Sequence, residues 1–245
     1  MLLESLTVKR GGRVIIRDLS ATFTGPGLYQ VMGPNGVGKT TLLLTILGLI
    51  KPVSGRVVVE APFRNKVVFS YMPQSFTIPH DTPMTVYEFV EGALLLENPW
   101  PRSLKTRVKG LRVEKALESV NIPRFLWKTR ISKLSTGMLQ RALLARAVAV
   151  EAPIVLLDEP FSNIDPEGKA EVAKLLGDMS SERLVIVTSH DPTLLLKYTR
   201  KILLLGYGEH FYGDVDEVLK YEVLSKLYKE CAVELEKHVH VVDWH

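Results

Sequence analysis

The sequence lacks several features that would place it in particular protein classes. A single cysteine, Cys231, excludes an internal disulfide and favours a reducing compartment. No apolar stretch reaches the ~18 to 20 residues that span a bilayer, and the first residues lack the basic-then-apolar layout of a secretory signal. Charges of both signs are interspersed around a net charge of +4, so nothing favours nucleic acid as a partner. We therefore expect a cytosolic protein whose membrane association, if any, comes through a partner.

The chain also lacks internal repeats and sustained heptads, which argues against two copies of one domain in the chain and against long coiled-coil arms. What it has is 245 residues, 46% of them hydrophobic, which is enough to bury a substantial core. This length suits one large domain, or a core domain with an inserted subdomain.

The most informative stretch is residues 33–40, GPNGVGKT, which matches the phosphate-binding pattern of four free positions between glycine and Gly-Lys-Ser/Thr. Its small residues let backbone N–H groups surround an anion at a helix N-terminus. Lys39 would reach the β- and γ-phosphates, and the Thr40 hydroxyl would ligate magnesium. The predicted nucleotide-binding residues are Gly33, Pro34, Asn35, Gly36, Val37, Gly38, Lys39, Thr40 and Thr41. This motif alone leaves kinases, GTPases and ATPases open.

Hydrophobic patterns predict an α/β fold around this loop. Residues 2–23 alternate as in an antiparallel hairpin, and short strands are expected at 27–32, 56–59 and 67–71. Helical spacing covers 85–150, continuous apolar runs at 154–157 and 184–188 indicate buried parallel strands, and a crossover helix is expected at 166–179. A hairpin over 201–212 and an amphipathic helix over 216–236 complete the chain.

Polar residues at the ends of three predicted strands are the candidate catalytic groups. Asp158 is placed to bind magnesium, and Glu159 to polarise an attacking water, since an extended chain sends adjacent side chains to different sides. His190 follows the strand at 184–188 and would reach the γ-phosphate or Glu159. Gln74, which directly follows Pro73, would offer its amide oxygen to magnesium or water.

With these residues in order, the chain closely resembles the ATP-binding cassette (ABC) ATPases from about residue 2 to about residue 228. The resemblance rests on six ordered motifs, which are the phosphate loop and five others. The helix expected at 141–147 follows the signature motif at 134–138. Those five are the glutamine loop at 71–74, the signature LSTGM at 134–138, the magnesium and base strand at 156–160, the aspartate loop at 162–165 and the switch histidine His190.

The resemblance implies a P-loop NTPase fold, a RecA-like mixed sheet with an antiparallel β subdomain and an inserted all-helical subdomain. It implies residues 1–84 as the β subdomain and first part of the ATP-binding core, 85–150 as the helical subdomain, 151–215 as the second part of the core, and 216–245 as a helical tail. It also implies ATP and Mg²⁺ as cofactors, the latter bound by Thr40, Gln74 and Asp158.

A head-to-tail homodimer that sandwiches two ATP molecules is implied as well. Ser135 and Gly137 of one subunit would bind the γ-phosphate held by the other, and Asp165 would link the two sites. The sequence departs from the family pattern in two places. Thr136 and Met138 stand where the family commonly has glycine and glutamine, and the aromatic residue that usually stacks on adenine is missing. Arg10 lies near that position and would stack on the base, or is a plain exposed arginine.

Within the family, three segments resemble the ATPases of metal-ion and iron-chelate importers: residues 84–90, 159–163 and 211–214. We expect a peripheral subunit at the cytoplasmic face of the membrane, working with membrane permease subunits and a substrate-binding protein. The glutamine loop and helical insertion would form the groove for a permease helix, lined by Met72, Phe76, Met84, Tyr87 and Phe89 unless these are core. An exporter motor and a soluble ATPase, as in iron–sulfur assembly, are the alternatives.

Overall fold

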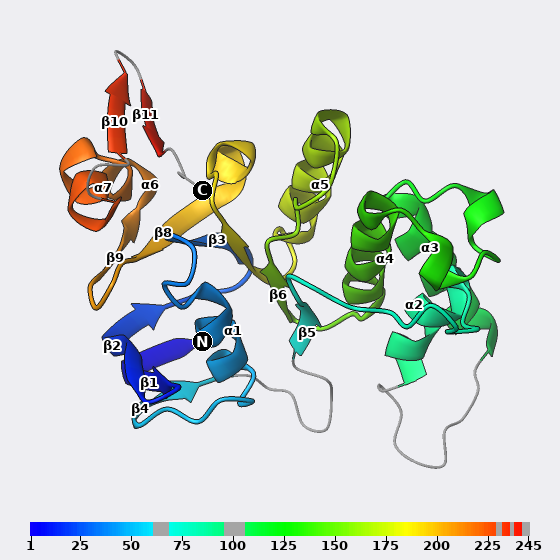
Figure 1. The fold of residues 1–245 in the computed structure, drawn as a ribbon, viewed down its shortest axis with the longest axis horizontal. Helices are drawn as coiled ribbons and strands as arrows, with labels where there is room; N and C mark the ends of the chain where they lie inside the picture. The colour runs from blue at the N-terminus through cyan, green and yellow to red at the C-terminus, as the bar shows by residue number, and fades with distance from the viewer. Residues whose placement is uncertain (61–68, 96–105, 229–231, 236–237, 242–245) are drawn as a thin grey trace. The chain divides into compact units, whose positions relative to one another are not determined.

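The computed structural model describes residues 1–60, 69–95, 106–228, 232–235 and 238–241 (Figure 1). The chain divides into two compact units, Met1–Pro62 with Ser180–His245, and Phe63–Met179. None of the described helices is both long and apolar enough to cross a membrane.

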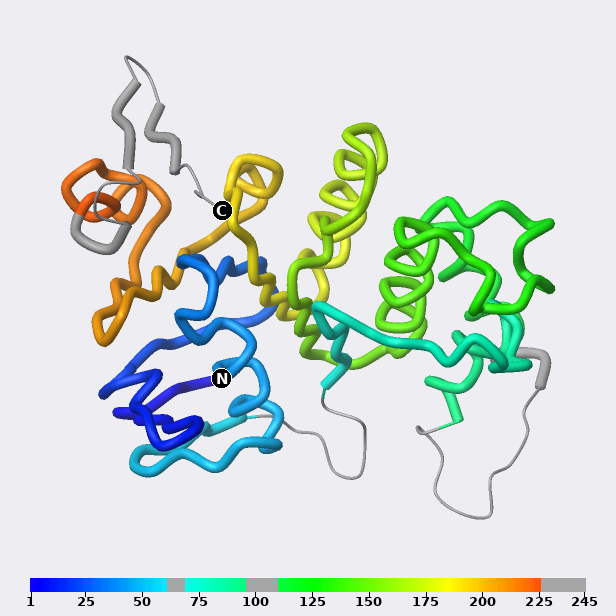
Figure 2. Tube along the Cα trace, viewed as in Figure 1, coloured from blue at the N-terminus to red at the C-terminus, as the bar shows by residue number. Residues whose placement is uncertain are grey.

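The first unit contains the predicted antiparallel hairpin. Strands β1 (Leu2–Arg10) and β2 (Arg13–Thr22) pair in antiparallel fashion, and β4 (Ser54–Val58) joins on the other side of β1. The three strands run side by side in the blue-to-cyan part of the Cα trace (Figure 2). Alternate residues of β1, namely Leu3, Leu6 and Val8, are buried, as expected for a sheet with one covered face.

A second group of strands in this unit carries the phosphate loop. Strand β3 (Gly27–Met32) pairs in parallel with β7 (Leu184–Ser189) on one side and with β8 (Thr199–Leu205) on the other, and β9 (His210–Asp214) is antiparallel to β8. Every residue of β3 and β7 is buried, which explains their continuous apolar runs. Helix α1 (Lys39–Ile46) follows β3, and the short 3-10 helix η4 (Thr193–Tyr198) precedes β8.

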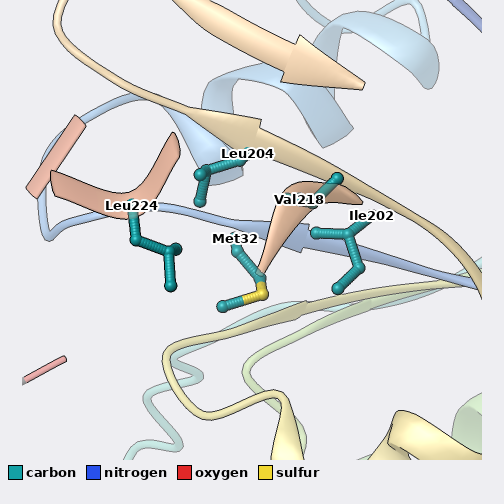
Figure 3. Close-up of a cluster of buried hydrophobic side chains, with 5 residues drawn as sticks. All are labelled: Met32, Ile202, Leu204, Val218 and Leu224. Atoms are coloured by element: carbon teal, nitrogen blue, oxygen red, sulfur yellow. The ribbon is translucent and has the colours of Figure 1, made fainter. Parts of the chain in front are cut away.

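Helices α6 (Val215–Val218) and α7 (Tyr221–Tyr228) cover part of this group. Their residues Val218 and Leu224 pack with Met32 of β3 and with Ile202 and Leu204 of β8 in one buried cluster (Figure 3). Burying aliphatic side chains of this size contributes about 1.5 to 3 kcal/mol each. The cluster therefore fixes the strand from which the phosphate loop leaves.

The helix predicted over 216–236 is wrong in its second half. Helix α7 ends at Tyr228, and β10 (Ala232–Leu235) pairs in antiparallel fashion with β11 (His238–Val241). Valine favours extended backbone, and both segments contain valine. The chain therefore forms a hairpin after α7 and does not continue as an amphipathic helix. His238 and His240 both lie on β11. Cys231 and His245 lie outside the described residues.

The second unit combines a strand pair with helices. Strand β5 (Phe69–Met72) pairs in parallel with β6 (Ile154–Asp158), and α5 (Pro166–Met179) follows β6. Helices α2 (Val86–Leu94) and α3 (Thr106–Ser119) both pack on α4 (Thr136–Ala149), with 3-10 turns η2 (Arg124–Leu126) and η3 (Ile131–Lys133) between α3 and α4. The expected helical stretch over 85–150 is thus built of helices and 3-10 turns in its described part.

Candidate functional site: a phosphate loop and a carboxylate loop

In the first unit, the loop between β3 and α1 is shaped by glycines that no other residue could replace without strain. Gly33 has φ 147°, and a Cβ there would lie 2.4 Å from the Leu205 carbonyl oxygen. Gly38 has φ 119° at the N-cap of α1, and a Cβ there would lie 2.5 Å from Ile15 Cγ2. The loop therefore lies close to Leu205 and Ile15. Its backbone N–H groups lie at the N-terminus of α1, a position that stabilises an anion.

Lys39 is 5% exposed and its ammonium stays over this loop. Its Nζ donates to the carbonyl oxygens of Gly33, at 2.7 Å, and Pro34, at 3.2 Å. Thr40 and Thr41 occupy the next positions of α1, and Thr41 is buried. The Tyr207 hydroxyl donates to the Asn35 carbonyl oxygen at 3.1 Å, a contact that the sequence patterns did not predict.

His190 lies beside the phosphate loop in this unit. Met32 and Ser189 are register partners in the parallel β3–β7 pair, so His190 and Gly33 are the next residues along neighbouring strands. The Ser189 hydroxyl donates to the Asp191 carbonyl oxygen at 2.6 Å and accepts from the Asp191 N–H at 3.1 Å, which fixes the turn that carries His190. Arg10, at the end of β1, is exposed on the same unit.

In the second unit, the ends of β5 and β6 bring the glutamine and the carboxylates together. Met72 and Leu157 are register partners, which places Gln74 at the same edge as Asp158 and Glu159. Gln74 Nε2 donates to Glu159 Oε2 at 2.9 Å. Asp158 is fully buried and Glu159 is 8% exposed. Burial, and to a lesser extent the nearby charge of Asp158, raises the pKa of Tyr71 to about 12.

The expectation that Asp158 and Glu159 alternate along an extended chain is wrong. Strand β6 ends at Asp158, and Glu159 has a left-handed backbone with φ 51°. The Glu159 carbonyl oxygen accepts from the Ser162 N–H at 3.2 Å, so the chain turns directly after the strand. A left-handed conformation in a non-glycine residue costs on the order of 1 to 3 kcal/mol and persists where surrounding contacts impose it.

The signature residues lie at the start of α4 in the same unit. Ser135 is the N-cap, and its hydroxyl oxygen accepts from the Met138 N–H at 3.3 Å. A Cβ on Gly137 would lie 2.7 Å from the Asn163 carbonyl oxygen, so the helix start touches the aspartate loop. Two further residues were not predicted: Gln140 Nε2 donates to the Glu159 carbonyl oxygen at 3.1 Å, and the buried Arg141 pairs with Asp165 at 3.4 Å.

Asp165 begins α5. Its Oδ2 accepts from the Gly168 N–H at 3.1 Å, and this bond is the main reason that the pKa of Asp165 lies below its ordinary value. The carboxylate therefore stays ionised at neutral pH, as a cap at a helix N-terminus favours.

An apolar groove of about 320 Å³ also lies within the second unit, lined by Tyr71, Pro73, Phe76, Thr77, Ile78, Pro79, Thr82, Met84, Phe89, Ile131, Leu143 and Arg146. Phe76 is 46% exposed and Met84 40%, and Phe89 lines the groove although it is largely buried. Met72, which is buried in the core, and Tyr87 are not among the lining residues. The Arg146 guanidinium lies over the Phe89 ring at 4.8 Å and donates to the Phe89 carbonyl oxygen at 2.5 Å. Burial lowers the pKa of Arg146.

The fold and the glycine-lined loop before a helix define the P-loop nucleoside triphosphatases. A family model described as "ABC transporter" matches residues 16–162, more than half of the chain. The chain belongs to the ABC transporter family, and within it to the ATP-binding subunits that hydrolyse ATP.

Individual relatives agree with this placement. The chain is 32% identical over 241 residues to a zinc import ATP-binding protein, ZnuC 2, of Hahella chejuensis, with 96% of this chain and 92% of the relative covered. It is 35% identical over 206 residues to ZnuC 2 of Aliivibrio fischeri, covering 83% and 78%. A solved inward-facing ABC transporter assigned to the metal-chelate type matches with a TM-score of 0.82 and 26% identity, covering 99% of this chain and 97% of that chain.

Proposed function

We propose that this subunit drives the import of a metal ion or metal chelate through separate membrane permease subunits, at the cytoplasmic face of the membrane. The names of the relatives support the cargo class, since they are zinc import proteins, and so does the metal-chelate type of the similar structure. A substrate-binding protein would deliver the cargo to the permease. An exporter motor and a soluble ATPase are the competing functions, and no described contact favours either.

The observation that carries the catalytic proposal is the Gln74–Glu159 contact at 2.9 Å. Glu159 acts as general base: it accepts a proton from water while the water oxygen attacks the γ-phosphorus and the bond to the β-phosphate oxygen breaks. ADP and phosphate leave. The Gln74 amide, which donates to Glu159, keeps its own oxygen available for the water or the metal. Lys39 and His190 contact the γ-phosphate, and Arg10 stacks on adenine.

Magnesium fits the oxygen donors that the family mechanism assigns to it. The Thr40 hydroxyl, the Asp158 carboxylate and the Gln74 amide oxygen are the hard ligands that Mg²⁺ prefers. When bound, the ion neutralises charge on the β- and γ-phosphates. As a member of the ABC transporter family, the subunit is proposed to bind one nucleotide with residues of both units.

The motor is proposed to work as a head-to-tail homodimer. Ser135 and Gly137, at the N-terminus of the 14-residue helix α4, would bind the γ-phosphate held by the partner's phosphate loop. Asp165, which pairs with Arg141 near the signature, would link the two sites. ATP closes the dimer and hydrolysis reopens it, which supplies the stroke for the permease.

The substitution Glu159→Gln tests the base. We expect ATP binding to survive and an ATP-bound dimer to accumulate, while turnover falls by about 10² to 10⁴-fold, the usual contribution of a general base. Turnover is measured as phosphate release and the dimer by size-exclusion chromatography with Mg²⁺ and ATP. Glu118→Gln, which removes an exposed carboxylate paired with Arg124, is the control and should match the parent. Parent-level hydrolysis by Glu159→Gln would disprove the assignment.

A further inference from the structure

Gln140 is a buried polar side chain that the proposed mechanism does not use. It is 4% exposed, and its Nε2 donates to the Glu159 carbonyl oxygen at 3.1 Å. A buried amide keeps such a bond because an unpaired donor there would be costly. Gln140 therefore holds the backbone of the residue proposed as general base.

The backbone of Glu159 needs such support. Its φ of 51° is disfavoured for a residue with a side chain, and both the Ser162 N–H and the Gln140 amide donate to its carbonyl oxygen. The direction of the carboxylate follows from this backbone conformation. The carboxylate oxygen Oε2, to which Gln74 donates, therefore depends on how this backbone is held.

Helix α4 holds the other end of the same loop. Gly137 lies against the Asn163 carbonyl oxygen, where even a Cβ would approach to 2.7 Å, and Arg141 pairs with Asp165. The first two turns of α4, which begin at Ser135, thus contact the loop from Glu159 to Asp165 at both ends. The start of α4 is therefore joined to the base loop by three contacts, at Gly137, Gln140 and Arg141.

We propose that Gln140 is a positioning residue through which α4 fixes the general base. This inference rests on the proposed function, in which Glu159 is the base and Ser135 binds phosphate. Gln140 acts through the Glu159 backbone, to which its amide donates, and not on the nucleotide itself. Its contribution is to keep the Glu159 carboxylate aimed during turnover, so its loss should lower kcat while leaving ATP affinity intact.

The test is Gln140→Met, which keeps the length of the side chain and removes the donor. We expect kcat for ATP to fall at least tenfold with KM changed less than twofold. Gln140→Leu is the second variant, in case methionine disturbs folding. Thermal unfolding of each purified full-length variant shows whether the fold is retained.

Ser70→Ala is the matched control. The Ser70 hydroxyl is buried and donates to the Ala147 carbonyl oxygen at 2.7 Å, so its loss removes a comparable bond to the same helix far from Glu159 along α4. Both changes should lower the unfolding temperature to a similar extent, and only the Gln140 variants should lose kcat. Equal kcat in Gln140→Met, Gln140→Leu and Ser70→Ala would overturn the inference.

The outcome is distinguishable from failure of the proposed function. If Glu159 is not the base, Glu159→Gln hydrolyses ATP at the parent rate whatever Gln140 does. If Glu159 is the base and Gln140 does not position it, Glu159→Gln is inactive while Gln140→Met matches Ser70→Ala. A loss of kcat in Gln140→Met together with a raised KM would also overturn the inference, because it would point to disturbed ATP binding.

Discussion

Two neighbouring residues of the signature, Thr136 and Gly137, differ in how much room their surroundings leave for a side chain. Thr136, where the family commonly has glycine, is exposed at the first position of α4 and has an ordinary helical backbone. Gly137 is different, because any Cβ there would overlap the Asn163 carbonyl oxygen. The packing of the helix start on the aspartate loop thus requires the second glycine and leaves the first position free.

The substitution Gly137→Ala follows from this contact. Because the obstacle is backbone, the helix or the loop must shift, and we expect a loss of about 1 to 3 kcal/mol of stability, as for other overpacked sites, with reduced ATP hydrolysis. Gly92→Ala is the control: it lies within α2, where a Cβ would make only an ordinary contact at 3.5 Å with Arg146 Nη1, and alanine there should stabilise by about 0.5 to 1 kcal/mol. Thermal unfolding of both variants measures the difference. Equal stability would contradict the steric argument.

At the residue level, the strand ends determine which of the predicted residues lie near one another, while their catalytic roles stay predictions. Gln74 and Glu159 meet because β5 and β6 are parallel neighbours whose carboxyl ends share an edge, and His190 adjoins the phosphate loop for the same reason. The Gln140 contact and the left-handed backbone of Glu159 could not be predicted, because both depend on how α4 packs against the loop after β6. No local pattern encodes that packing.

At the scale of elements, run length and periodicity were sufficient for most of the chain. The helix expected at 166–179 is α5, and the apolar runs at 154–157 and 184–188 are β6 and β7. The tail was mispredicted because a short valine-containing hairpin follows α7 without a proline or glycine to mark the change. Helix α2, in contrast, begins at a capping box formed by Thr85 and Glu88.

The capping box of α2 gives a prediction at this scale. Thr85 accepts from the Glu88 N–H at 3.2 Å, and Glu88 accepts from the Thr85 N–H at 2.8 Å. Thr85→Ala should cost about 1 kcal/mol of stability at neutral pH, and Thr85→Ser, which keeps the hydroxyl, should cost much less. Thermal unfolding of the three proteins measures this.

The deficit of Thr85→Ala should depend on pH. The backbone and hydroxyl bonds from Thr85 hold the pKa of Glu88 below its ordinary value. A lowered carboxyl pKa means that this stabilisation is complete above the unfolded value of about 4.3 and is lost as pH falls through the folded value. The gap between parent and Thr85→Ala should therefore be constant from about pH 5 to 8 and narrow below about pH 4. A gap that widens on acidification would contradict the capping box.

At the scale of the whole molecule, the division into units separates two kinds of chemistry. The phosphate loop and His190 belong to one unit, and the carboxylates, the signature and the apolar groove belong to the other. Tyr71 and Pro73 line the groove, and Gln74, the next residue, binds Glu159. If the proposed permease helix binds in the groove, it lies one residue away from the group that contacts Glu159.

The substitution Phe76→Asp tests the groove as the permease-binding surface. Phe76 is 46% exposed at the groove and its ring lies 5.7 Å from that of Phe89. If a permease helix buries it, a charge there should forfeit about 1.5 to 3 kcal/mol of burial, a 10- to 100-fold loss of affinity. Co-purification with the membrane subunits should fall accordingly, while hydrolysis by the subunit alone stays at the parent rate. Phe125→Asp is the matched control, because Phe125 is 79% exposed in the same unit and does not line the groove. Equal binding by the two variants would place the permease contact elsewhere on the subunit.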